Sequence, residues 1–182
     1  MRHVFLTGDT RLGKTTLLNA LLALHPAWRV GGFRTYLYQN GVYLAPADAP
    51  QDKDGLPDAP RDEQSRVGLR GKPPVAFPAA FDALGASLLS PAGKDVLLMD
   101  ELGFLERDAQ RFQCAVLHAL DGSAPVLGVL KPLRTPFLDR VRAHPDVRVL
   151  AVTRENRDEL MQTVLSQAAF FPPQREASRP IS

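Results

Sequence analysis

Short apolar runs alternate with stretches of helical periodicity along most of the chain. Continuous apolar runs predict strands, and apolar residues spaced by three or four positions predict helices. Strands are expected at 4–6, 28–38, 42–44, 96–99, 126–130 and 147–152, and helices at 17–24, 79–89, 112–120, 137–142 and 160–165. This alternation is typical of an α/β fold, in which helices flank a mostly parallel sheet.

Two segments depart from the alternation. Asn40-Gly41 stands between two extended segments and predicts a two-residue hairpin turn, because both residue types tolerate positive φ. Residues 46–74 are rich in proline and aspartate and have almost no apolar periodicity. We expect them to form a mobile surface loop or a lid, which a short strand around Val67–Leu69 could interrupt.

The composition indicates a globular protein. Of the 182 residues, 45% are hydrophobic and 23% are charged, so we expect one domain over residues 1–171 and a flexible tail at 172–182. The net charge of +2 argues against a nucleic-acid or membrane surface. The single cysteine, Cys114, excludes a disulfide framework within the chain and is expected to be a core thiol. No apolar run is long enough to span a membrane and no signal peptide is evident, which predicts a cytoplasmic protein.

The segment between the first predicted strand and the first predicted helix carries a phosphate-binding pattern. Gly8-Asp9-Thr10-Arg11-Leu12-Gly13-Lys14-Thr15 matches the P-loop, or Walker A motif, G-x-x-x-x-G-K-[ST]. Its glycines let successive backbone N–H groups point at one anion, and the helix that follows directs its positive dipole end at the same phosphates. Lys14 is expected to neutralise the β- and γ-phosphate oxygens of a nucleoside triphosphate, and the Thr15 hydroxyl to bind Mg²⁺.

Two acidic residues follow the apolar run 96–99. Asp100 and Glu101 are therefore expected at the carboxyl end of a buried strand, where ligands bind in open parallel sheets. Taken alone, the pair could be a solvated strand end. Together with the P-loop, it predicts that Asp100 holds the metal and that the catalytic residue Glu101 orients or deprotonates an attacking water.

Five blocks of the sequence, in matching order from residue 1 to about 168, resemble the small P-loop nucleoside-triphosphatases, a group that includes the cancer-related nucleoside triphosphatase of animals. The blocks are 2–8, 13–17, 31–35, 100–103 with Glu106, and 152–157. The resemblance implies a RecA-like parallel sheet and slow, Mg²⁺-dependent hydrolysis of ATP, GTP and other nucleoside triphosphates with broad base tolerance. It also implies that Glu101 is the catalytic acid and that Gly13, Lys14, Thr15 and Thr16 bind phosphate.

The chain departs from that family at three positions near the expected site. Asp9 and Arg11 stand where the family's loop usually carries proline and small residues, and the Asp9 carboxylate could repel phosphate unless Arg11 compensates. Phe104 stands where the family tends to have a lysine, which removes a cation.

Several further residues allow two interpretations. Asn156 could begin the last helix, with Glu159 in capping-box spacing, or contact the base of the nucleotide. Glu106 could orient the site or begin a helix, and Lys131 could contact the γ-phosphate or be a solvated loop lysine. One of the arginines at 134, 140, 142, 148, 154 and 157 could be a cationic finger, although most are expected on solvated helix faces.

The sequence favours hydrolysis of nucleoside triphosphates and leaves two alternatives. One is a kinase that transfers the γ-phosphate to a small molecule under the 46–74 loop. The other is a nucleotide-dependent switch that binds a protein partner. The chain has no N-K-x-D motif, so GTP selectivity is not expected.

Overall fold

The computed structural model describes residues 2–156, 159–160 and 162–163. Its strands are β1 (His3–Thr7), β2 (Val30–Tyr38), β3 (Gly41–Pro46), β4 (Arg66–Leu69), β5 (Val75–Ala76), β6 (Val96–Leu102), β7 (Val126–Leu130) and β8 (Val147–Ala151). Its helices are α1 (Lys14–Ala23), α2 (Pro78–Ala80), α3 (Ala86–Leu88), α4 (Gln110–Asp121) and α5 (Pro136–Ala143), and the π-helical turn η1 (Phe81–Gly85) joins α2 to α3.

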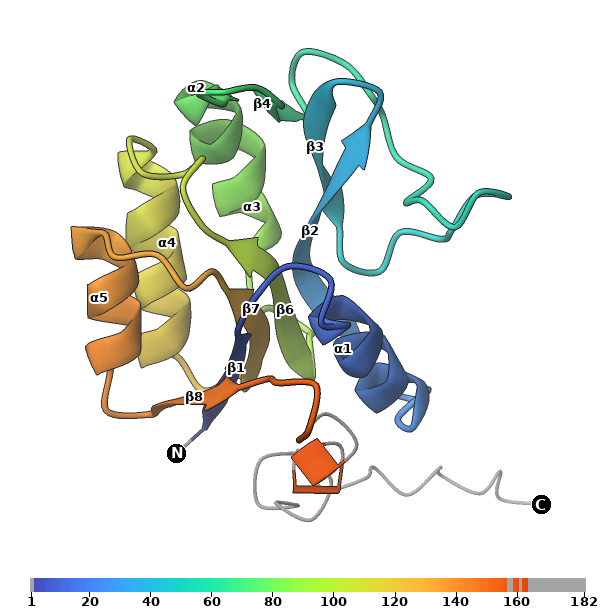
Figure 1. Ribbon diagram of the computed structural model, residues 1–182, viewed down its shortest axis with the longest axis vertical. Coiled ribbons are helices and arrows are strands. Elements are labelled where there is room, and N and C mark those ends of the chain that lie inside the picture. The colour runs from blue at the N-terminus through green and yellow to red at the C-terminus, as the bar shows by residue number, and fades with distance from the viewer. Residues whose placement is uncertain (1, 157–158, 161, 164–182) are drawn as a thin grey trace.

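The strands form one sheet in the order β5-β4-β3-β2-β6-β7-β1-β8. The five strands β2, β6, β7, β1 and β8 pair in parallel, whereas β3, β4 and β5 extend the sheet by antiparallel pairing. Strand β7 lies between β1 and β6, so the strand before the P-loop and the strand that carries the acidic pair are separated by one neighbour. This arrangement confirms the predicted α/β fold with a RecA-like, mostly parallel sheet (Figure 1).

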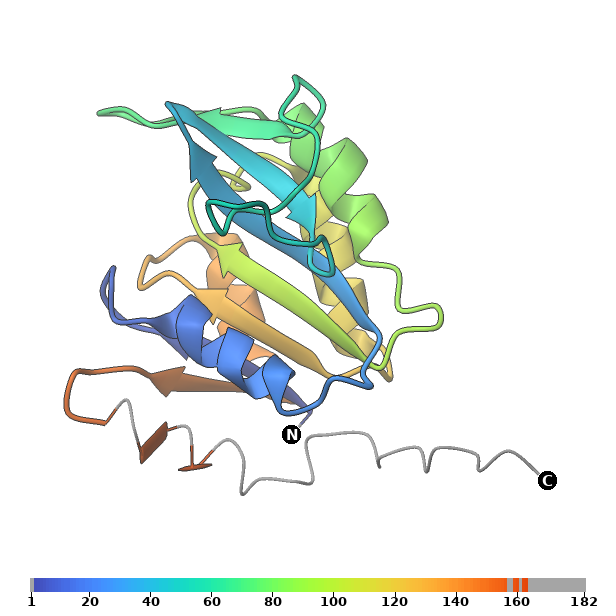
Figure 2. The same ribbon diagram turned by 90° about the vertical axis from the view of Figure 1, so that its right-hand side faces the viewer.

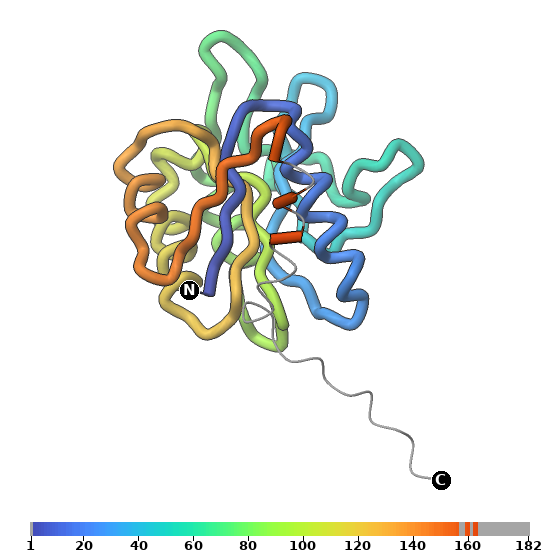
Figure 3. Tube along the Cα trace, turned by 60° about the horizontal axis from the view of Figure 1, so that its bottom comes forward, coloured from blue at the N-terminus to red at the C-terminus, as the bar shows by residue number. Residues whose placement is uncertain are grey.

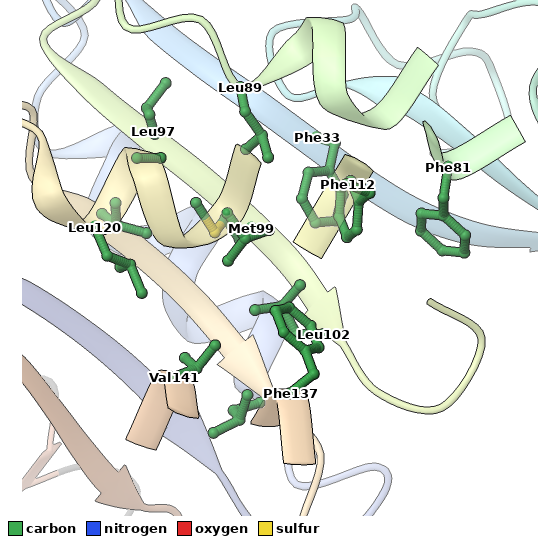
Figure 4. Close-up of a cluster of buried hydrophobic side chains, with 14 of the residues drawn as sticks. Phe33, Phe81, Leu89, Leu97, Met99, Leu102, Phe112, Leu120, Phe137 and Val141 are labelled. Atoms are coloured by element: carbon green, nitrogen blue, oxygen red, sulfur yellow. The ribbon is translucent and has the colours of Figure 1, made fainter. Parts of the chain in front are cut away.

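Helices cover both faces of the parallel strands. Helix α1 packs on one face, and α2–α5 pack on the other (Figures 1 and 2). Because side chains alternate along a strand, Val4 and Leu6 of β1 face α1, whereas Phe5 belongs to the core on the other side. Figure 4 shows that larger core, where Phe112 of α4 lies beside Phe33 of β2. Two buried layers therefore hold the strand ends in fixed positions.

A close approach between β2 and β6 explains one of the glycines in the 31–35 block. Gly32 has φ +91°, and a Cβ atom there would lie 1.9 Å from the carbonyl oxygen of Leu98. Only glycine adopts this conformation in so little space. The resulting register pairs Arg34 with Asp100 across the two strands, which brings a charged residue of β2 to the acidic pair of β6.

The hairpin between β2 and β3 is displaced by one residue from its prediction. Tyr38 pairs with Gly41, so the turn residues are Gln39 and Asn40, and Gln39 has φ +52°. Gly41 is the first residue of β3. A Cβ atom at Gly41 would lie 2.5 Å from the ring of Tyr43, so the glycine lets that ring lie over β3 and is not part of the turn.

The segment 46–74 contains the predicted short strand, β4, whose Val67 is fully buried. Before β4 the backbone is held by side chains. Asp52 accepts hydrogen bonds from the backbone N–H groups of Asp54 and Leu56 and from the Arg61 guanidinium, and Asp62 closes a turn with Ser65. These aspartates therefore shape turns of the chain, as short polar side chains commonly do. Mobility of this segment stays a prediction.

The helices predicted at 17–24, 79–89, 112–120 and 137–142 are confirmed, and their observed ends differ from the predicted ones by one to three residues. Of the helix expected at 160–165, the structure describes residues 160, 162 and 163, and the tail expected at 172–182 lies wholly outside the described residues. The prediction that Cys114 is a core thiol is wrong, because this residue is exposed on α4, opposite Phe112 and Val116. Within the part of the chain that the structure describes, no helix has the length and apolar character needed to cross a membrane.

Candidate functional site

The predicted P-loop is a curled connection between β1 and α1. Gly8 has φ +133°, and Gly13, directly before α1, has φ +77°. A Cβ atom at Gly8 would lie 2.5 Å from the carbonyl oxygen of Val152. Val152 is the residue after β8, the strand that pairs with β1. Both glycines are thus required by backbone geometry. The loop and the end of β8 lie side by side (Figure 3).

Lys14 reaches back across this loop from the first turn of α1. Its side chain is 8% exposed, and Nζ donates hydrogen bonds to the carbonyl oxygens of Gly8, at 2.9 Å, and Asp9, at 2.5 Å. An ammonium group has three N–H donors, so these two contacts leave one donor for a ligand. The lysine charge therefore lies within the curl of the loop, close to the positive end of the α1 dipole.

The other predicted loop residues surround this centre. The side chains of Asp9, Thr10, Arg11 and Thr16 are exposed, whereas Leu12 packs against the core beneath α1. Arg11 has φ +66°, a left-handed conformation that is rare outside glycine. Because Asp9 and Arg11 are both exposed to water, solvent screens the charge of the Asp9 carboxylate.

Asp100 lies against the P-loop helix. The Thr15 hydroxyl donates to Asp100 Oδ1 at 3.2 Å, and the Arg34 guanidinium contacts Asp100 Oδ2 at 3.4 Å. Burial raises the pKa of the Asp100 carboxyl, and the nearby Arg34 charge and the Thr15 hydrogen bond oppose that increase. The structure thus brings together the two side chains expected to bind Mg²⁺, and both supply oxygen donors, the type that this ion prefers.

Glu101 is contacted by a lysine from the neighbouring strand. Lys131, directly after β7, places Nζ 2.7 Å from Glu101 Oε1, and both side chains are partly exposed. The Glu101 backbone N–H also donates to Thr35 Oγ1 of β2 at 3.2 Å. Lys131 follows a strand that pairs with β1, which is the placement that its predicted phosphate contact required.

The sequence indicated that the acidic pair would follow the end of its strand, but the strand is longer than predicted. Strand β6 continues through Glu101 to Leu102, with an irregular register to β7 after Met99. Asp100 is tolerated inside the strand because Thr15 and Arg34 satisfy its carboxylate. Both acids still lie at the carboxyl edge of the sheet.

Glu106 is a buried carboxyl group beside this site. It lies four positions before α4, so it does not begin that helix, and it accepts a hydrogen bond from the Gly103 backbone N–H. Burial raises the pKa of Glu106 to about 7, an increase that the Gly103 hydrogen bond and the Lys131 charge oppose. Glu106 therefore fixes the turn that follows Glu101.

Glu106→Gln is expected to remove a pH dependence of folding stability. The pKa of this glutamate is about 7 in the folded protein, against an ordinary value of 4.5. At a pH between these two values, Glu106 keeps its proton in the folded state but has released it in the unfolded state. The free energy of unfolding therefore falls as pH rises through this range. For the wild-type protein, the free energy of unfolding should fall by about 3 kcal/mol in total. The glutamine variant, whose amide oxygen can still accept from Gly103, should lack this part of the pH slope.

Urea unfolding at intervals from pH 4.5 to pH 8 measures this effect. Glu63→Gln, at an exposed glutamate, is the matched control and should keep the wild-type slope. Equal slopes for Glu106→Gln and wild type would contradict the assignment.

Asn156 lies in the turn after β8. Its Oδ1 accepts from the Thr153 N–H at 2.8 Å, its Nδ2 donates to the Ala151 carbonyl at 2.9 Å, and its own carbonyl accepts from the Leu160 N–H at 2.8 Å. Its side chain thus closes a turn and its backbone accepts the first bond of a helical turn. The base contact stays a prediction.

Two of the candidate finger arginines have partners. Arg134 and Arg142 both contact the Asp139 carboxylate, and Arg142 also donates to the Lys131 carbonyl at 2.7 Å. Arg157 lies outside the described residues. Arg34, in contrast, was not predicted as a site residue although it contacts Asp100. Its position in the 31–35 block was the only signal, since the register that joins it to Asp100 is not visible in the sequence.

Comparisons with known proteins agree with this geometry. The family model described as NTPase matches residues 3–165. The human cancer-related nucleoside-triphosphatase is 31% identical over 91% of this chain and 95% of the human protein. A solution structure of a human cancer-related nucleoside triphosphatase covers 91% of this chain and 96% of its own, with 29% identity and a TM-score of 0.63. The crystal structure of THEP1 from Aquifex aeolicus matches over 90% of this chain and 97% of the THEP1 chain, with a TM-score of 0.68. The sequence identity is 19%, so this likeness supports the fold alone.

Proposed function

Because the chain belongs to the NTPase family and is a nucleoside-triphosphatase, we propose that it hydrolyses the β–γ phosphoanhydride bond in an Mg²⁺-dependent reaction with little selectivity for the base. One observation carries the proposal. Lys14 at the centre of the loop, the Thr15–Asp100 pair and Glu101 all meet at one edge of the sheet. Binding of phosphate, binding of a metal and activation of water would then occur side by side.

The loop residues account for the binding of phosphate. Backbone N–H groups between Gly8 and Thr15 and the dipole of α1 favour negative charge at the loop. The third donor of Lys14 would contact the β- and γ-phosphate oxygens, where charge increases in the transition state. Its buried position makes that contact stronger than the same contact in water.

Thr15 and Asp100 would hold Mg²⁺. Their oxygen atoms lie 3.2 Å apart, and Mg²⁺ commonly binds through one or two protein oxygens together with phosphate oxygens and water. The bound ion would supply neutralisation of phosphate charge. Arg34, on the other oxygen of Asp100, would keep that carboxylate ionised and oriented, since its positive charge opposes the effect of burial.

Glu101 would act on water. In the proposed step the water oxygen forms a bond to the γ-phosphorus, the bond from that phosphorus to the β–γ bridging oxygen breaks, and the water proton passes to the Glu101 carboxylate. The products are a nucleoside diphosphate and inorganic phosphate. Lys131, whose Nζ lies 2.7 Å from Glu101 Oε1, would orient that carboxylate and would lie near the γ-phosphate.

Broad base tolerance is proposed because the sequence has no N-K-x-D motif and the polar atoms of the Asn156 side chain are used within its own turn. Cytoplasmic location and a role as a nucleotide-dependent switch stay predictions.

The test of metal dependence uses Thr15→Val and Thr15→Ser. Phosphate release from ATP, GTP, CTP and UTP is measured against Mg²⁺ concentration. Valine removes the hydroxyl at nearly constant volume, so the Mg²⁺ concentration for half-maximal rate should rise about tenfold, which corresponds to the loss of about 1.4 kcal/mol of metal binding. Serine keeps the hydroxyl and should remain close to wild type. Phosphate release that does not need Mg²⁺, or that occurs with one base only, would contradict the proposal.

A further inference from the structure

A cavity of about 450 Å³ lies directly beside Glu101. It is bounded by the P-loop, the β2–β3 hairpin, the end of β4 and the turn after β6. Thr10, Thr35, Glu101 and Lys131 line it near the P-loop. Leu37, Val42, Leu69 and Leu105 supply apolar wall, and Arg70 lies where β4 ends.

The cavity is larger than hydrolysis requires. One water occupies about 30 Å³ of liquid, whereas sites for small organic ligands commonly measure about 300 to 1,000 Å³. An apolar wall with a few polar groups is also typical of such sites.

The polar groups lie at separate ends of the cavity. Thr35 contacts the backbone of Asp100 and Glu101, so it marks the catalytic end. Leu69, next to Arg70, pairs with Gly41, which pairs with Tyr38 three positions along β2 from Thr35. At the usual rise of a strand and a spacing of about 4.8 Å between neighbouring strands, this places the backbone of Leu69, two strands from β2, about 14 Å from that of Thr35. The long Arg70 side chain covers part of this distance, and the remainder suits a small ring compound with a substituent at each end.

Arg70 provides a charge for one of those substituents. Its side chain is exposed at the cavity, and no ion pair joins it to another residue within the described ranges. A guanidinium group binds a carboxylate through two parallel hydrogen bonds, which fixes orientation as well as position.

We propose that this cavity binds a small alcohol with an apolar body and a carboxylate at its far end, and that the alcohol accepts the γ-phosphoryl group. The carboxylate lies on Arg70, and the hydroxyl lies at Glu101. The alcohol oxygen forms the bond to the γ-phosphorus, the bond to the β–γ bridging oxygen breaks, and the hydroxyl proton passes to Glu101. The products are a phosphate monoester and a nucleoside diphosphate. This inference rests on the proposed function, because it uses the same phosphate site and the same acid.

Three related probes test the inference. 4-(Hydroxymethyl)benzoate carries both end groups on one ring, 4-methylbenzoate lacks the hydroxyl, and benzyl alcohol lacks the carboxylate. Binding of 4-methylbenzoate without nucleotide is measured by ligand-observed NMR, with wild type, Arg70→Ala and Arg140→Ala. Arg140 is an exposed arginine of α5 and serves as the matched control. We expect saturable binding that Arg70→Ala weakens at least fivefold and Arg140→Ala leaves unchanged.

Transfer is measured with Mg²⁺ and ATP. With 4-(hydroxymethyl)benzoate, the ADP formed should exceed the free phosphate formed, and the difference should appear as a phosphomonoester in ³¹P NMR. 4-Methylbenzoate should give no ester, and benzyl alcohol should give much less. Absence of saturable binding, binding that is equal in Arg70→Ala, or equal amounts of ADP and free phosphate with the hydroxy acid would each overturn the inference. ATP hydrolysis without any probe tests the proposed function separately, because the binding measurement needs no nucleotide.

Discussion

Lys14→Ala is expected to reduce phosphate release from Mg²⁺–ATP at least about a hundredfold, since one charge-stabilising donor typically contributes a factor of 10²–10³. The side chain is almost fully buried within the curl of the P-loop, where Nζ contacts the carbonyl oxygens of Gly8 and Asp9. Alanine leaves those carbonyls facing the triphosphate without a neutralising cation. We therefore expect weaker nucleotide binding as well as slower turnover, and steady-state kinetics together with calorimetric titration measure both.

Lys53→Ala, at an exposed lysine of the 46–74 segment, is the control and should retain wild-type kinetics. Circular dichroism and thermal unfolding establish that the Lys14 variant is folded. A folded Lys14→Ala protein with turnover within threefold of wild type would contradict the proposed phosphate site.

Glu101→Gln is expected to reduce kcat by about 10²–10⁴-fold, the usual contribution of a general base, with nucleotide affinity nearly unchanged. The amide keeps the size of the side chain but cannot accept the proton of the attacking water. Loss of the partly exposed contact to Lys131 should cost less than about 1 kcal/mol of stability. Separate measurements of kcat and of nucleotide binding distinguish these effects.

Glu155→Gln, at an exposed glutamate beyond β8, is the matched control and should leave kcat unchanged. If Glu101→Gln weakened binding and turnover by the same factor, the role of Glu101 would be to bind the nucleotide, and the assignment as general base would be wrong.

Most residues of the candidate site could be named from the sequence because their signals are local. The P-loop places Gly8, Gly13 and Lys14 within one short connection, and the acidic pair follows directly on a buried apolar run. Parallel strands bring their carboxyl ends to one edge, so two separate segments were expected to meet there. The contact between Thr15 and Asp100 agrees with that expectation.

What the sequence did not predict depends on long-range contacts. Arg34 reaches Asp100 only because β2 pairs in parallel with β6 in one particular register, and no local pattern encodes that register. The role of Gly41 likewise depends on where the Tyr43 ring lies.

The error at Cys114 has a different origin. Phe112, Val116 and Ala119 define the buried face of α4, and a residue two positions from Phe112 points to the opposite side of a helix. Helical phase, applied strictly, would have placed Cys114 on the exposed face. The apolar character of the surrounding segment was the wrong criterion.

A crystal structure of Glu101→Gln with Mg²⁺ and ATP tests the central claim most directly. We expect the β- and γ-phosphates inside the curl of residues 8–15, with Lys14 Nζ in contact with their oxygens and the metal bound by Thr15 and Asp100. The substituted side chain at position 101 should lie on the far side of the γ-phosphorus from the β–γ bridging oxygen. A triphosphate bound elsewhere, or one in this loop with that side chain turned away from the γ-phosphate, would contradict the account.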